Sequence, residues 1–85
     1  MDYVYVLKGE AYVEDTEWLI GIFSTYEKVL LGAKEELKEE HWEGAVEVDS
    51  NSKHILKTWV LKNEDGDAAF CLLIEKYELN TFRWS

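Results

Sequence analysis

The sequence contains no proline, a single cysteine and only two histidines, and each scarcity removes a class of protein. Cys71 cannot form an internal disulfide, and its setting in FCLLI predicts a buried small apolar side chain rather than a reactive thiol. This cysteine usage fits a reducing, cytoplasmic compartment. Because no linker, repeat or low-complexity tract interrupts the 85 residues, one domain spanning residues 1–85 is expected.

Long apolar runs are absent as well. The longest, residues 68–74, has seven residues, whereas a helix needs about 20 to cross a bilayer. No basic region precedes an apolar stretch near residue 1. Neither a membrane span nor an export signal is therefore expected.

Groups that could perform catalysis or hold a cofactor are few. No serine lies in the strained, Gly-flanked turn of a nucleophile elbow, and neither common Gly-rich phosphate-binding motif occurs. His41 has Leu37 and Lys38 where a helical second metal ligand would stand. Residues 49–52 begin like a calcium loop, but its sixth position, which requires Gly, is His54. We expect a protein that is not an enzyme and needs no metal or other cofactor.

Negative charge is what the sequence has in excess. Hydrophobic residues still make up 47%, enough for a core without disulfides, while the formal net charge is −9. Residues 1–49 hold thirteen acidic and four basic residues, and residues 50–85 hold five of each. Such a field repels nucleic acid and anionic membranes, and it attracts the basic surface of a protein partner. The alternative is that the acidity only keeps a small protein soluble.

Four apolar segments predict strands. In residues 2–8 successive side chains alternate between two faces, as in a strand. Residues 18–23, WLIGIF, predict its antiparallel partner. Gly9 and Gly21 are the positions best suited to a bulge. Residues 54–62 and 68–79 flank an Asp65-Gly66 step, which is typical of a tight hairpin. The second of these is almost entirely apolar at its start and is the predicted central strand.

One helix is predicted between the two strand pairs. Ser24 followed by Glu27 is a capping-box pattern, and a single apolar stripe supports a helix over residues 25–40, formed by Tyr26, Val29, Leu30, Ala33 and Leu37. Gly32 costs this helix about 1 kcal/mol relative to Ala, which indicates either a close neighbour or tolerated weakness. Phe82 and Trp84 predict a tail that packs back on the domain.

The expected fold class is α+β, an antiparallel four-stranded sheet with one helix on one face, in the order strand-strand-helix-strand-strand. A short additional strand at residues 45–49 is the alternative that would make the sheet five-stranded.

Three segments, VYVLKGE (4–10), LIGIFSTYEKV (19–29) and IEKYELN (74–80), resemble a widespread family of small proteins of unknown function from bacteria and their phages. The resemblance covers about half the chain and rests on core and cap positions. It implies the fold above and a phage or mobile-element origin, where small acidic proteins that block host enzymes recur. The segment 43–67 departs from the family pattern.

The acidic segment after residue 34 is the candidate binding surface. On a helix extended to residue 43, Glu36, Glu39 and Glu43 fall within about 60° of one another, with Glu40 at the edge. Lys34 and Lys38 could instead pair with Glu35 on a solvated face. Trp42 is an exposed hot spot if the helix reaches Glu43, and a core residue if it ends by His41. The partner-binding set is Glu35, Glu36, Glu39, Glu40, Trp42 and Glu43, with Glu14, Asp15 and Glu17 from the earlier acidic stretch.

These features favour an acidic binding protein, and with the origin that the resemblance implies we expect a phage-encoded inhibitor of a host nucleic-acid-handling enzyme such as a nuclease or CRISPR effector. It would act as a nucleic-acid mimic. The alternative is a self-associating structural or regulatory module, a homodimer formed through a sheet edge or tryptophan face. A small-ligand pocket between helix and sheet, lined by Tyr3, Tyr5 and Trp59, is a third hypothesis.

Overall fold

A computed structural model describes residues 3–49 and 52–78 and shows a five-stranded sheet with one helix against it. The elements follow in the order β1 (Tyr3–Ala11), β2 (Thr16–Phe23), α1 (Tyr26–Leu37), the single 3-10 turn η1 (Glu40–Trp42), β3 (Val46–Val48), β4 (Ile55–Lys62) and β5 (Ala68–Glu78). The predicted packing of Phe82 and Trp84 lies outside the described residues.

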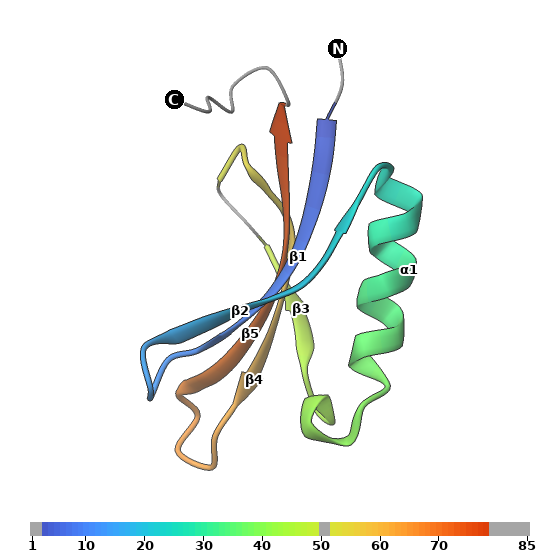
Figure 1. Cartoon of the computed structure of the whole chain (residues 1–85). Helices are drawn as coiled ribbons and strands as arrows, with labels where there is room; N and C mark the ends of the chain where they lie inside the picture. Colours follow the sequence, from blue (N-terminus) through green and yellow to red (C-terminus); the bar gives the residue numbers. More distant parts are fainter. Residues whose placement is uncertain (1–2, 50–51, 79–85) are drawn as a thin grey trace.

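The sheet is antiparallel throughout, with the strand order β2-β1-β5-β4-β3 (Figure 1). The α+β prediction is confirmed, and the alternative with a fifth strand at residues 45–49 holds as β3. β5 is the central strand, as its apolar sequence predicts, and it pairs with β1 on one side and β4 on the other.

The β1–β2 pair contains the predicted bulge. Gly21 lies opposite Leu7 and Leu19 lies opposite Lys8, so Ile20 has no partner in β1. Because the extra residue adjoins Gly21, the bulge sits at one of the two glycines expected to permit it. Gly9, the other expected position, stays in regular pairing opposite Trp18.

The helix begins and ends differently from its prediction. Its N-cap is Thr25, whose Oγ1 accepts a hydrogen bond from the Lys28 backbone N–H at 3.1 Å, so the expected cap at Ser24 is wrong. The helix ends at Leu37 rather than near residue 40, because Glu39 adopts an extended backbone conformation.

The core lies between α1 and one face of the sheet. Leu7, Leu72 and Ile74 are fully buried, and they pack with Val29 and Ala33 of the helix. The apolar stripe on α1 is therefore correct. Trp42 of η1 and Trp59 of β4 complete this core.

A polar turn joins β4 to β5 as the Asp65-Gly66 step predicts. The Asn63 side-chain oxygen accepts hydrogen bonds from the backbone N–H groups of Asp65 and Asp67, both at 3.0 Å. Gly66 has φ of 85°, a left-handed conformation that glycine adopts at little cost. This turn holds three carboxylates at the end of the hairpin.

Candidate functional site: an acidic end

Three segments distant in sequence converge at one end of the molecule. The β1–β2 turn, the β4–β5 turn and η1 all lie at the lower end in Figure 1. The pairing explains two of them, since Ala11 of β1 lies opposite Phe70 of β5. Side-chain packing explains the third, because the rings of Trp42 and Phe70 meet edge to face with their centroids 6.4 Å apart. We call residues 10–17, 34–43 and 62–67 the acidic end.

The acidic end accounts for the whole net charge of the chain. Its segments contain twelve of the eighteen acidic residues and three of the nine lysines and arginines, which gives −9. The rest of the sequence holds six of each sign. The acidic region in the structure therefore differs from the acidic part of the sequence, residues 1–49. Glu27 and Glu47 lie outside the acidic end, and the β4–β5 turn belongs to it.

Most of the predicted binding residues are exposed at this end and point to solvent. They are Glu14, Asp15, Glu17, Glu35, Glu39, Glu40 and Glu43. Two of them have a cationic neighbour, Glu35 with Lys38 at 3.1 Å and Glu17 with Lys8 at 3.3 Å. Within residues 3–49 and 52–78, the other five form no ion pair, so their field is not neutralised locally. Lys34 likewise forms no pair there.

Trp42 does not belong to the binding surface. Its side chain is 1% exposed, so the alternative in which it packs in the core is correct and the exposed hot spot is wrong. The indole Nε1 donates a hydrogen bond to Glu36 Oε2 at 2.7 Å. A large aromatic ring gains more by burial than by extending the helix, and this contact folds η1 back under α1.

Glu36 is likewise an internal residue. Its side chain is 20% exposed, and besides the Trp42 indole it faces His41 Nε2 at 3.5 Å. Because α1 ends at Leu37, Glu36 is also the last member of the predicted carboxylate row that lies on the helix. The expectation of four carboxylates along one helix face is therefore wrong, and the charges are spread over α1, η1 and the two turns.

The β1–β2 turn shapes an acidic hollow on this end. Asp15 has φ of 52°, a left-handed conformation that aspartate tolerates better than most residues. The hollow has a volume of about 210 Å³ and is lined by Glu10, Tyr12, Asp15, Thr16 and Glu17. The Tyr12 hydroxyl hydrogen-bonds with Cys71, which raises the pKa of Tyr12 to about 12. Burial raises the pKa of the Cys71 thiol, so this cysteine is held in its neutral form.

Sequence reasoning missed the contribution of Glu64, Asp65 and Asp67 to this surface. The Asp65-Gly66 step predicts the hairpin turn that contains them, which is correct, but the turn also lies beside the β1–β2 turn because β1 and β4 both pair with β5. The expected pocket of Tyr3, Tyr5 and Trp59 does not form as a unit: Trp59 is buried in the core and Tyr5 packs edge to face on Tyr26.

No protein-family model, curated protein or solved structure matches this chain. The resemblance to the family of bacterial and phage proteins stays a prediction. Among the described residues, no group of three or more His, Cys, Asp or Glu side chains is placed to hold a metal ion. The helices in the same residues are too short or too polar to pass through a bilayer.

Proposed function

We propose that the protein is a non-enzymatic binding protein whose acidic end engages the basic surface of a protein partner. The observation that carries the proposal is the concentration of the entire net charge of −9 on three converging segments. A single-sign field of this kind accelerates encounter with a basic partner and disfavours contact with nucleic acid itself.

The most specific form of the proposal is a phage-encoded inhibitor of a host enzyme that handles nucleic acid. Exposed carboxylates on η1 and on two turns can occupy a surface that otherwise binds phosphates, and the mechanism is competitive exclusion. Because the attraction is between exposed charges, salt screens it with a Debye length of about 10 Å at 0.1 M. Binding should therefore weaken steeply as salt is raised.

The test is affinity capture from a bacterial lysate at low salt, followed by elution at high salt. The variant Glu39→Lys/Glu43→Lys reverses two exposed charges of the acidic end and leaves Glu36 in place for Trp42. The control Glu27→Lys/Asp49→Lys reverses two exposed charges elsewhere and changes the net charge equally. We expect a nucleic-acid-binding protein that the wild type and the control retain and the first variant loses, and whose nucleic-acid binding the wild type blocks.

Equal retention of that protein by both variants would contradict the proposal, because total charge rather than the acidic end would then explain binding. Circular dichroism of each variant checks that the fold is retained. Loss of binding with loss of fold is resolved by Glu39→Gln/Glu43→Gln, which removes the same charges without introducing repulsion.

The second candidate is a self-associating module, and one observation favours it. Edge strand β2 exposes Leu19 and Ile22 and contains no lysine or proline, the residues that commonly protect a sheet edge from pairing. Sedimentation over a range of concentrations separates the candidates. Self-association at micromolar concentration would favour the module, whereas the first proposal needs no second copy.

A further inference from the structure

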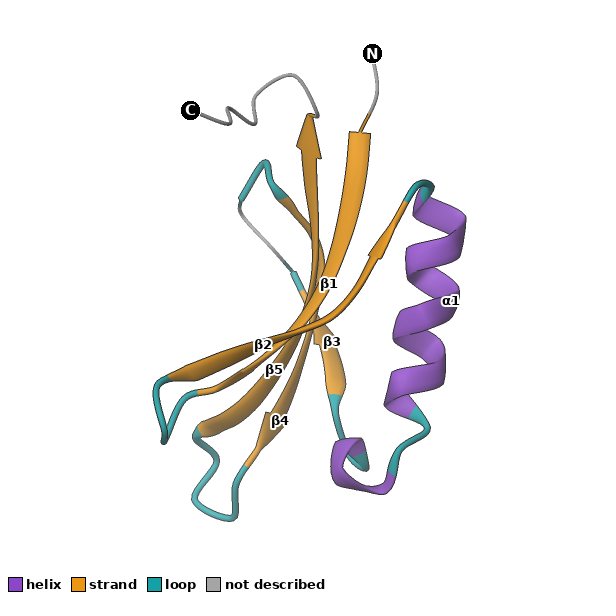
Figure 2. Ribbon diagram, in the orientation of Figure 1, coloured by secondary structure: helices purple, strands orange, loops and turns teal. Residues whose placement is uncertain are grey.

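The sheet has a second face, which the helix does not cover. Side chains directly opposite one another in antiparallel strands share a face, so Leu7 and Ile74 lie together against α1. Their neighbours Val6, Lys8, Leu73 and Glu75 point the other way. Both α1 and η1 pack on the first face in the described part of the chain (Figure 2). We call the second face the open face.

The central strand is apolar on both sides. In β5, residues 71 to 74 are all buried, including Cys71 and Leu73, which point to the open face. An antiparallel sheet with one solvated face normally alternates apolar and polar residues. Cys71 is shielded by Tyr12, and Leu73 lies opposite Lys8 in the register, whose aliphatic stem can shield it. The middle of the open face is thus already dry without a covering layer.

Apolar side chains extend from this dry centre to both margins of the sheet. On β2, Leu19 and Ile22 are each 61% exposed, and on β3 Val46 is 53% exposed. The register places all three on the open face, opposite Lys8, Val6 and Val60. Exposed apolar side chains gathered on one face of a small protein commonly mark a site of association.

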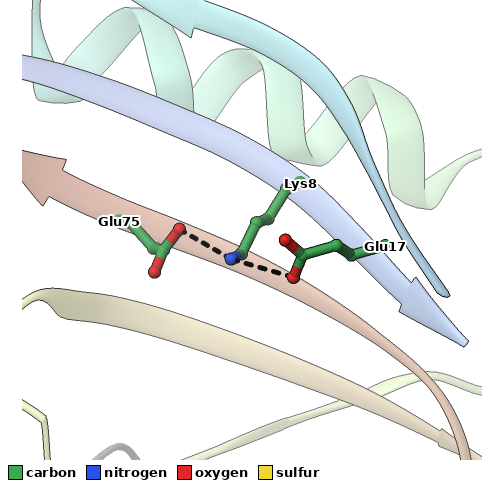
Figure 3. A network of polar contacts seen from close by, with 3 residues as sticks. All are labelled: Lys8, Glu17 and Glu75. Carbon is green, nitrogen blue, oxygen red and sulfur yellow. Dashed lines mark hydrogen bonds and ion pairs between the residues drawn. The ribbon is translucent and has the colours of Figure 1, made fainter. Parts of the chain in front are cut away.

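One charged cluster interrupts the apolar surface, and its charges do not balance. Lys8 Nζ lies 3.1 Å from Glu75 Oε1 and 3.3 Å from Glu17 Oε2 (Figure 3). Partial burial lowers the pKa of Lys8, but the two carboxylates outweigh that effect and raise it above its usual value. One ammonium therefore meets two carboxylates, and the cluster keeps one unit of negative charge. The Glu75 side chain is only 12% exposed.

We propose that the open face binds an amphipathic helix of a basic partner protein. The apolar stripe of that helix covers Leu19, Ile22, Leu73 and Val46, and one of its arginines or lysines pairs with Glu17 and Glu75. The inference rests on the proposed function, because the acidic end would attract such a partner and Glu17 belongs to both surfaces. The inference specifies the surface on which the partner docks and the secondary structure of the segment that binds there.

The chemistry of the face selects this occupant. A face presents side chains and no free backbone groups, so it favours a helix over an added strand, which would pair with an edge. A second copy of the chain would bring two clusters of the same sign together across an apolar interface, which is unfavourable. A helix carrying basic residues completes the charge balance and covers the apolar side chains that are exposed on β2 and β3.

The probe is a synthetic amphipathic peptide with leucine and arginine at helical spacing. A peptide of the same composition with the two residues alternating, as in a strand, is the control. Affinity is measured by calorimetry, and the site is mapped by amide chemical shifts of the labelled protein. We expect the helical peptide to bind more tightly, with shifts at residues 19–22, 46–48 and 73–75 and none on the outer side of α1 near Leu31.

Two pairs of variants test the site. Leu19→Ser/Ile22→Ser should weaken binding of the helical peptide by about tenfold, while Leu31→Ser, which alters an equally exposed leucine on α1, should leave it unchanged. Glu17→Gln should weaken binding severalfold, whereas Glu47→Gln, which alters an exposed carboxylate beside a lysine on the other face of the sheet, should not. If a serine variant fails to fold, the amide chemical shifts of the wild-type protein with the helical peptide still locate the binding site.

Three results would overturn the inference. Concentration-dependent shifts on the open face without peptide would show that a second copy covers it. Equal affinity for the two peptides, or for the wild type and Leu19→Ser/Ile22→Ser, would show that the apolar surface plays no part. Shifts confined to the acidic end and lost in Glu39→Lys/Glu43→Lys would reject docking on the open face but leave the proposed function standing. The proposed function fails separately, if lysate capture is insensitive to that same variant.

Discussion

Phe23 shows how single residues set the distance between helix and sheet. Its ring lies between two glycines, Gly21 in β2 and Gly32 in α1. A Cβ added to Gly32 would stand 2.7 Å from Phe23 Cζ, and one added to Gly21 would stand 2.8 Å from Phe23 Cε2. Of the two explanations for Gly32 offered by the sequence, the close neighbour is correct.

We therefore expect Gly32→Ala to destabilise the protein. In an exposed helix this substitution adds about 1 kcal/mol of stability, but overpacking typically costs about 1–3 kcal/mol, and the Phe23 ring could make room only by moving against Gly21 on its other side. Urea denaturation should show a net loss of about 1 kcal/mol in the free energy of unfolding. In the Phe23→Leu background the same change should become neutral or stabilising. A gain in stability with Phe23 intact would contradict this account.

Trp42 fixes the position of η1 through one hydrogen bond and its buried ring. Trp42→Phe keeps most of the apolar area but removes the donor to Glu36, leaving a largely enclosed carboxylate without that partner. Hydrogen bonds to charged groups contribute about 1.5–3 kcal/mol, so we expect urea denaturation to show a loss of about 1.5 kcal/mol.

Glu36→Gln is the matched control for this contact. Its amide oxygen can still accept from the indole, so the loss should be smaller than for Trp42→Phe. Equal stability of Trp42→Phe and the wild type would mean that the indole hydrogen bond does not hold η1 in place.

At the scale of elements, only one of two adjacent hydroxyl residues caps helix α1. Thr25 caps the Lys28 amide in the structure, and Ser24 does not. Thr25→Ala should lower the free energy of unfolding by about 1 kcal/mol, the typical cost of losing an N-cap, whereas Ser24→Ala should change it little. Equal losses, measured by thermal or urea denaturation, would mean that the two residues share the cap.

The strands and the helix face were predictable because local patterns determine them. Alternation in residues 2–8, the Asp65-Gly66 step and the stripe through Val29 and Ala33 each agree with what the tertiary structure requires. The end of the helix was not predictable from such patterns. Residues 38–40 suit a helix, but burial of Trp42 on the far side of a bend outweighs their preference, and that depends on contacts with Phe70 in β5.

At the scale of the whole molecule, strand order decides which charges become neighbours. The sequence showed an excess of acidic residues before residue 50, and it identified most of the exposed carboxylates. The sequence did not show that the β4–β5 turn, with its three carboxylates, lies at the same end of the sheet as the β1–β2 turn. That proximity depends on β5 lying between β1 and β4, a long-range pairing that hydrophobic periodicity does not specify.

Repulsion among the like charges at the acidic end should lower the free energy of unfolding of the isolated protein, and salt should reduce that repulsion. Raising NaCl to 1 M shortens the Debye length to about 3 Å, so repulsion among the carboxylates of the acidic end is screened. We expect the free energy of unfolding in urea, an uncharged denaturant, to rise with NaCl for the wild type. Glu39→Gln/Glu43→Gln should be more stable at low salt, by about 0.3 kcal/mol for each charge removed, and should respond less to NaCl.

Glu27→Gln/Asp49→Asn removes equal charge outside the acidic end and should keep the salt response of the wild type. If the two variants respond alike, repulsion is spread over the whole surface, and the carboxylates of the acidic end do not act as one field.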